Sequence, residues 1–182
     1  MQKRSHKLLA QSLIDSYDGF AKRRFELAFL FGSFEPDCNP LSYIKGSRRG
    51  KKLMGHNFSN SQAFIHRRIR KLQNRDHWTT WQYYTLGKLT HYLADAFTFP
   101  HNDTYTDSLM AHRRYEHDLR LYLSSNLDRT VLRPAEATAD PAAAIDRLHR
   151  QYLTATSDWQ RDMRYILRAN GLLLACLLPQ AL

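Results

Sequence analysis

Hydrophobic residues recur every three or four positions along nearly the whole chain, which is the spacing of one face of an α-helix. In residues 59–75, for example, Ile65, Ile69 and Leu72 fall on one side of a helical wheel, and most basic residues fall elsewhere. We find no run of alternating apolar and polar residues strong enough to indicate a half-buried strand. The pattern therefore predicts an all-α protein.

Capping residues, Gly and Pro indicate where the helices begin and end. Residues 32–56 are rich in Gly, contain two Pro and have few apolar positions, so they are expected to form a long loop that carries Asp37 and His56. Long ordered loops usually have a function. The helices are expected at about 5–14, 18–31, 59–75, 78–99 and 107–125, with two more starting at Asp140–Pro141 and at the S-x-x-Q of 157–160.

Two helical residue pairs stand out as candidate metal ligands. His91 and Asp95 are four residues apart, as are His112 and Glu116, so each pair lies on one helix face and can hold one ion. Between them, His101 follows Pro100, where the chain leaves the helix and can bring a third imidazole to the same cleft. Imidazole and carboxylate together suit zinc.

A single His–acid pair at this spacing is more often only a surface ion pair, so the position of each pair on its helix matters. His112 and Glu116 fall among Leu109, Leu119 and Leu123, the inward stripe, whereas His117 points about 140° away. A buried carboxylate needs a cation or a metal as partner.

The first pair lies nearly opposite the apolar stripe of its own helix. Residues 83–99 nevertheless contain only one cation and one anion, which indicates burial on most sides. We interpret the polar face with His91 and Asp95 as the wall of a cleft.

Composition limits the classes of protein without choosing among them. The 182 residues suit one domain with a sizeable core, and the net charge of +10 predicts attraction to polyanions such as nucleic acid, anionic lipid or phosphate-bearing substrates. With two distant Cys and no apolar signal-peptide core at the start, a cytoplasmic location is expected. The apolar end, 171–182, is much shorter than the roughly 20 residues that cross a bilayer.

The order of these residues resembles the zinc-dependent phospholipase C family, which is related to the trinuclear zinc nucleases. The resemblance rests on His6, Asp37, His56, H-x-x-x-D at His91 and Asp95, His101, and H-x-x-x-E at His112 and Glu116. It implies a single all-α hydrolase domain over residues 1–182, with a ligand-bearing core at about 6–117 and supporting helices at about 140–178.

The resemblance also implies how the ligands are shared. One zinc is expected on Asp37, His56, His91 and Asp95, another on His101, His112 and Glu116, and a third on His6 with bridging Asp95. Secreted members complete the third site with the amine and carbonyl of an N-terminal Trp. No Trp precedes His6 here, so only His6, the shared Asp95 and what the free Met1 end or water can offer remain for the third ion. Two zinc ions are therefore expected to bind tightly and the third weakly.

The expected activity is hydrolysis of a phosphoric ester, with a phospholipid headgroup or another phosphodiester as substrate and an anionic membrane surface as a partner. Two zinc ions about 3.5–4 Å apart lower the pKa of a shared water towards 7, and the resemblance suggests Asp37 as the group that accepts its proton. Two alternatives remain open: a single-strand-type nuclease, and a non-catalytic helical protein in which zinc only stabilises the fold.

Overall fold

The computed structural model describes residues 1–39, 57–127 and 135–179, and within these ranges the chain forms seven α-helices and no strand. The all-α expectation is therefore confirmed. The helices are α1 (Lys3–Ser16), α2 (Arg23–Cys38), α3 (Phe58–Gln73), α4 (Thr80–Ala96), α5 (Leu109–Asn126), α6 (Pro141–Thr154) and α7 (Trp159–Leu177), with a short 3-10 helix η2 (Phe99–His101) after α4.

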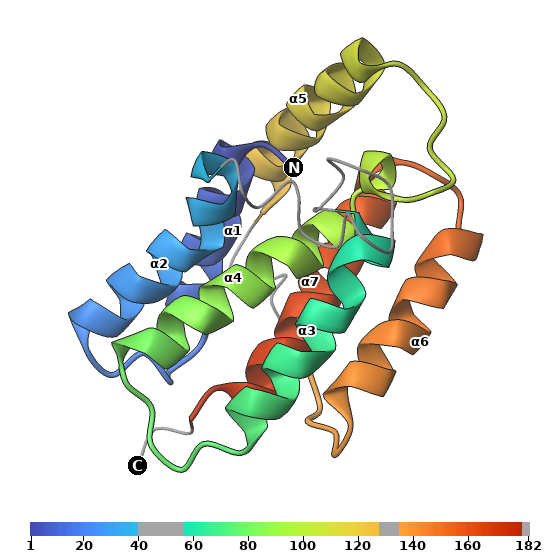
Figure 1. Cartoon of the computed structure of the whole chain (residues 1–182). Coiled ribbons are helices and arrows are strands. Elements are labelled where there is room, and N and C mark those ends of the chain that lie inside the picture. The colour runs from blue at the N-terminus through green and yellow to red at the C-terminus, as the bar shows by residue number, and fades with distance from the viewer. Residues whose placement is uncertain (40–56, 128–134, 180–182) are drawn as a thin grey trace.

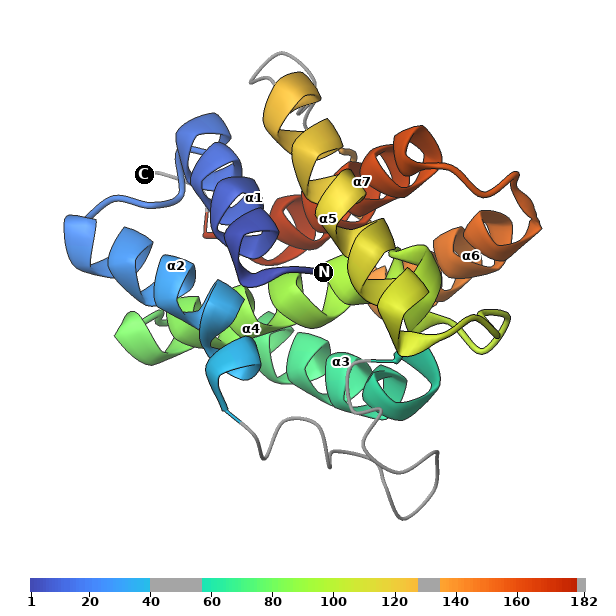
Figure 2. The same ribbon diagram turned by 90° about the horizontal axis from the view of Figure 1, so that it is seen from above.

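Helix α4 lies in the middle of the bundle, with α1 and α2 on one side and α3 on the other (Figure 1). It packs against α1, α2, α3 and α7, and most of its residues are buried. Seen from above, the start of α1 reaches the carboxyl end of α4 beside α5 (Figure 2). Polar side chains at this end of α4 are thus enclosed by segments from distant parts of the sequence.

Helices α2 and α4 approach each other unusually closely because each has a glycine at the contact. A Cβ atom at Gly32 would lie 2.2 Å from the Tyr84 carbonyl oxygen, and one at Gly87 would lie 2.1 Å from the Phe29 carbonyl oxygen. Both neighbours are backbone atoms, which cannot rotate away. Only glycine fits at these two positions without moving a helix.

The sequence prediction for residues 32–38 was wrong. Gly32 and Pro36 were interpreted as the start of a loop, but α2 continues to Cys38 and carries Asp37 in its last turn. Gly32 is a packing residue here, and the contact with α4 outweighs its poor helix propensity. Pro36 cannot donate a backbone hydrogen bond, but it lies in the last turn of α2, so little of the helix is affected.

The prediction for the last two helix starts was half right. Asp140 caps α6, accepting a hydrogen bond from the Ala143 amide, as expected. Helix α7, however, is capped by Asp158, which accepts from the Arg161 amide, and not by Ser157. Adjacent Ser and Asp are both good caps, and the sequence pattern favoured the wrong one. Among the described residues, no helix has the length and apolar content needed to span a bilayer.

Candidate metal centre

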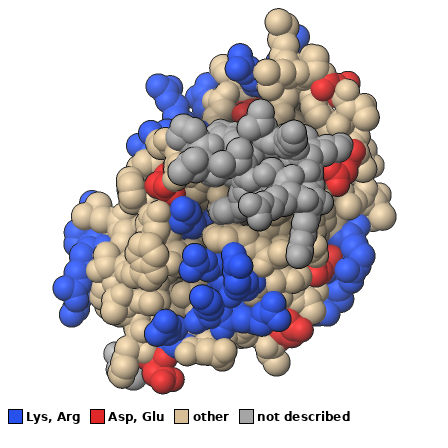
Figure 3. All heavy atoms as spheres, in the orientation of Figure 1, with Lys and Arg blue, Asp and Glu red and all other residues tan. Residues whose placement is uncertain are grey.

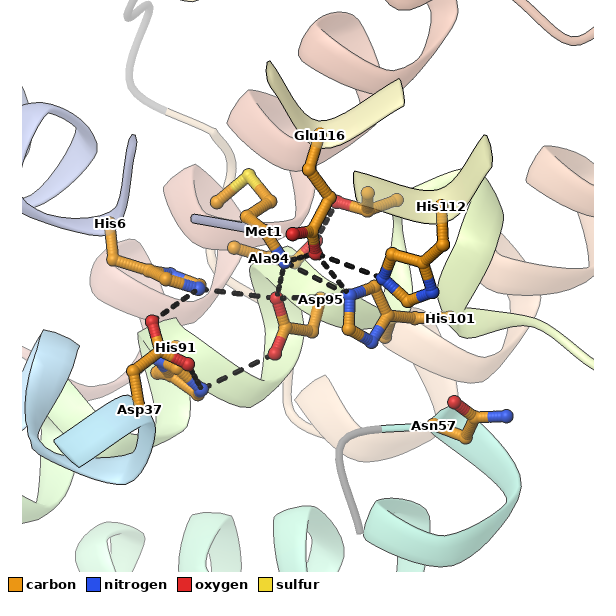
Figure 4. Close-up of polar contacts among 12 residues, drawn as sticks. Met1, His6, Asp37, Asn57, His91, Ala94, Asp95, His101, His112 and Glu116 are labelled. Carbon is orange, nitrogen blue, oxygen red and sulfur yellow. Dashed lines mark hydrogen bonds and ion pairs between the residues drawn. The ribbon is translucent and has the colours of Figure 1, made fainter. Parts of the chain in front are cut away.

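Asp95 is the centre of the candidate site and is fully buried (Figure 4). Its Oδ1 atom lies 3.2 Å from Nε2 of His6, and its Oδ2 atom lies 3.3 Å from Nε2 of His91. The His6 and His91 rings are stacked, with centroids 3.9 Å apart. His6, His91 and Asp95, from α1 and α4, therefore form one group with the donor types that hold a metal ion.

A second group lies on the other side of Asp95. Nε2 of His101 is 3.0 Å and Nε2 of His112 is 3.1 Å from the same Oε1 atom of Glu116. Nε2 of His101 also lies 4.0 Å from Oδ1 of Asp95. Through His101, the second group thus approaches the same carboxylate as the first group.

The sequence placed His112 and Glu116 on an inward face and His117 outside, and His117 is indeed exposed. Leu109 was expected on the inward stripe, but 67 % of its surface is exposed, because it lies in the first turn of α5.

The close approach of α2 and α4 also orients His91. The Nδ1 atom of His91 donates a hydrogen bond of 2.9 Å to the Ser33 carbonyl oxygen. This hydrogen bond fixes the tautomer and leaves Nε2, which faces Asp95, with its lone pair available. His91 is not exposed at all, so the face that the wheel placed opposite the apolar stripe is covered by α2.

Asp37 lies at the edge of the first group. Its two oxygens are 3.8 Å from Nε2 of His91 and 3.9 Å from Nε2 of His6. Its side chain keeps 13 % of its surface exposed, so it connects the buried group with solvent. His56, expected beside it as a ligand, lies outside the described residues.

The amino group of Met1 lies between the two groups. Its nitrogen contacts Oδ1 of Asp95 at 2.5 Å, Oε1 of Glu116 at 3.0 Å and Nε2 of His101 at 3.0 Å. Burial alone would lower the pKa of this amine, but the charges of Asp95, Glu116 and Asp37 outweigh it and raise the pKa to about 11. The carboxylates thus attract a cation to the point where the two groups meet.

Burial controls the charge state of the candidate ligands. Burial and the neighbouring His91 lower the pKa of His6 to about 4, and burial and the Met1 ammonium lower the pKa of His101. Burial would raise the pKa of Asp95, but the ammonium and the His101 and His91 rings hold that pKa well below its usual range. Neutral His6 and His101 beside a charged carboxylate are the protonation states that zinc requires.

The donor set fits zinc on two observations. Each group offers two imidazole nitrogens and a carboxylate oxygen within 4.8 Å of one another, which are ligand types of catalytic zinc sites. In addition, neither ring nitrogen of buried His6 makes a hydrogen bond within the described part of the chain. A buried polar atom without a partner is costly, and a metal ion at Nε2 would relieve that cost.

Asp162, a buried carboxylate on α7, holds segments that carry ligands of the second group. Asp162 accepts hydrogen bonds of 2.9 Å from the Phe99 amide and from the Tyr115 hydroxyl, both at Oδ2. Phe99 begins the 3-10 helix that ends at His101, and Tyr115 precedes Glu116. One side chain therefore fixes the two segments that carry ligands of this group.

A histidine on α6 supports the same 3-10 segment from another side. Nε2 of His149 donates to Oδ1 of Asn102 at 2.8 Å and lies 3.2 Å from the Ala96 carbonyl oxygen. The Asn102 amide in turn donates to the Ala96 and Thr98 carbonyls at 3.2 and 3.0 Å. Residues around His101 are thereby held by side-chain hydrogen bonds as well as by their own backbone.

We expect His149 to make the protein less stable in acid. Burial lowers its pKa from 6.5 to about 4, so the unfolded chain binds a proton before the folded chain does. This contribution is complete above pH 6.5 and is lost as the pH falls towards 4, with a loss of about 3 kcal/mol. Chemical denaturation in the presence of a chelator, for the wild type and His149→Gln, should give a smaller acid loss in the variant. Parallel pH curves would rule out this role.

Two of the supporting residues could have been found in the sequence. His149 lies on the apolar stripe of Ile145, Leu148 and Tyr152, and Asp162 lies at helical spacing from Ile166 and Ala169. A polar residue on a core-facing stripe indicates a buried hydrogen-bonding role. The Ser33 carbonyl gave no such signal, because backbone groups have no pattern in the sequence.

Comparison with known proteins identifies the family. A family model described as zinc dependent phospholipase C matches residues 5–164. Neither the curated proteins nor the solved structures contain a match to the chain. The matched region includes both groups of candidate ligands, His6 to Glu116, and the α6 and α7 residues that support them. On this match, the chain belongs to the zinc-dependent phospholipase C family.

Proposed function

We propose that the protein hydrolyses a phosphodiester, with a phospholipid headgroup as the substrate class. The observation that carries the proposal is the convergence of His6 and His91 on one side, and of His101 on the other, upon buried Asp95. Glu116 joins this arrangement through its contact with His101. Membership of a zinc-dependent phospholipase C family supports the reaction class.

In this proposal Asp37, His56, His91 and Asp95 would hold one zinc ion, and His101, His112 and Glu116 would hold another. Asp95 would also face the ion that His6 binds. When bound, zinc lowers the pKa of water and neutralises charge on the phosphoryl oxygens. Asp37 accepts the proton of the attacking water, because it is the carboxylate at the solvent-exposed edge of the first group. A third, weaker ion near His6 is part of the same hypothesis.

Solvent access favours catalysis over a purely structural role for the metal. The side chain of His112 keeps 25 % of its surface exposed and Glu116 keeps 14 %. Structural zinc sites are closed, with four protein ligands, whereas catalytic sites leave a position for water or substrate. The second group has three described ligands and an exposed side, which suits an open site.

The proposal is tested by zinc analysis and a substrate panel with a matched pair of histidine variants. We expect the wild type to hydrolyse phosphatidylcholine and short phosphodiesters in preference to phosphomonoesters and single-stranded nucleic acid. His112→Ala should lower zinc affinity by about a hundredfold, since even loss of a residue that supports a ligand costs 10–100-fold, and should lose activity.

His117→Ala is the control, because His117 is exposed on the same helix. It should keep both zinc and activity. Equal zinc content in the two variants would contradict the ligand assignment. A preference for single-stranded nucleic acid would assign the site to a nuclease instead.

A further inference from the structure

The outer face of α2 and the start of α4 expose an unusual amount of apolar surface. Leu27 is 50 % exposed, Phe31 is 52 % exposed and Trp81 is 60 % exposed. The Tyr84 ring lies between them, with its centroid 5.9 Å from that of Phe31 and 5.1 Å from that of Trp81. We call Leu27, Phe31, Trp81 and Tyr84 the aromatic face.

The aromatic face borders an open hollow of about 690 Å³ between α2 and α4, lined by Ala28, Phe31, Thr79, Thr80, Trp81 and Tyr84. None of the described residues that line it is charged. Large exposed side chains are normal when scattered singly, but a contiguous group of them indicates an interaction site.

Cations lie at both ends of the aromatic face. Lys22 and Arg24 are exposed at the start of α2, and the ammonium groups of Lys3 and Lys7 lie 5.0 and 4.4 Å from the Phe34 ring centroid, near the end of α2. Within the described chain none of these four forms an ion pair with a carboxylate. Figure 3 shows an uncharged area over α2 and the start of α4, with Lys and Arg side chains beside it and acidic side chains at its upper edge.

The aromatic face continues towards the candidate metal centre. The Phe31 and Phe34 ring centroids are 5.5 Å apart, and Asp37 follows Phe34 by one helical turn. Lys3 and Lys7 lie on α1 on either side of His6 in the sequence. A flat partner bound to this face would therefore contact the helices that carry His6 and Asp37.

We propose that the aromatic face docks the protein on bilayers that contain anionic phospholipid. Exposed Trp, Phe and Leu with a half-buried Tyr suit the interface between headgroups and acyl chains, and Lys or Arg beside them suit anionic headgroups. The net charge of +10 acts in the same direction. The inference rests on the proposed function, because a phospholipid substrate lies in such a surface.

The first test is co-sedimentation with vesicles of equal parts phosphatidylglycerol and phosphatidylcholine. We expect the wild type to bind, and the double variant Phe31→Ala/Trp81→Ala to bind at least about tenfold more weakly, because it loses most of the exposed aromatic area. Lys7→Gln should bind about fivefold more weakly, from the loss of about one basic residue's attraction. Vesicles of phosphatidylcholine alone should bind less of the wild type.

A matched leucine pair controls for a general loss of hydrophobicity. Leu27 and Leu121 are 50 % and 49 % exposed, and Leu121 lies on α5, away from the aromatic face. Leu27→Ala should weaken vesicle binding and Leu121→Ala should not. Equal effects of the two changes, or wild-type binding by the double variant, would overturn the proposal.

Activity and oligomeric state distinguish the remaining outcomes. The double variant should hydrolyse a short soluble phosphodiester at the wild-type rate but vesicle lipid more slowly. If binding behaves as expected and no substrate is hydrolysed, the docking face stands and the proposed function fails. If the variants weaken binding of single-stranded DNA, or convert a dimer to a monomer, without changing vesicle binding, the face has another partner and the proposal is wrong.

Discussion

Asp95→Asn is expected to abolish phosphodiester hydrolysis and to lower the bound zinc by more than one ion per chain. Asparagine keeps the volume of the side chain but removes the charge. It also replaces one acceptor oxygen with an NH2 donor. The two oxygens of Asp95 face His6 and His101 on one side and His91 on the other, so this one change alters both groups of ligands.

The matched control is Asp76→Asn, an exposed carboxylate between α3 and α4, which should keep zinc and activity. Zinc content after dialysis and turnover at rising zinc concentration give the two measurements. Glu116→Gln should differ from Asp95→Asn, because the ligands that Glu116 contacts are His101 and His112 of the second group, and it should cost about one ion. Retained turnover of Asp95→Asn at saturating zinc would contradict the shared role of Asp95.

Local spacing predicted the ligand pairs because it depends only on helix geometry. His91 with Asp95 and His112 with Glu116 lie on one helix face wherever α4 and α5 form, and the structure brings both pairs to the site. The direction in which each face points depends on the neighbouring helices. The wheel placed His91 opposite the apolar stripe of α4, and α2 covers that face.

The secondary-structure prediction failed where a tertiary contact outweighs the local conformational preference of a residue. Gly32 normally indicates a turn, but here it allows α2 to touch α4, so the helix continues and positions Asp37. No local pattern distinguishes a glycine that ends a helix from one that packs against another helix. The sequence suggested the free Met1 end only as a ligand of the third ion, and its position between the two groups depends on the approach of α1 to α4.

The close approach of α2 and α4 at Gly32 and Gly87 gives the second large effect. Ala normally stabilises a helix interior by about 1 kcal/mol relative to Gly, but the new methyl group of Gly87→Ala would lie 2.1 Å from the Phe29 carbonyl oxygen. Relief requires the helices to separate, and overpacking of this kind costs about 1–3 kcal/mol or more. We therefore expect a net loss of about 2 kcal/mol in the free energy of unfolding, measured by chemical denaturation.

Gly32→Ala and Gly87→Ala should each weaken zinc binding, although neither glycine lies among the candidate ligands. Separation of α2 from α4 withdraws the Ser33 carbonyl from Nδ1 of His91, which it now meets at 2.9 Å, and loss of such support lowers metal affinity about 10–100-fold. Ser125→Ala, at an exposed position of α5, should change neither quantity appreciably. Because one separation of the helices relieves both clashes, the double variant Gly32→Ala/Gly87→Ala should lose less stability than the sum of the single variants. Additive losses would contradict a single shared separation of the helices, and wild-type zinc affinity in a destabilised Gly87→Ala variant would show that the contact does not hold His91 in place.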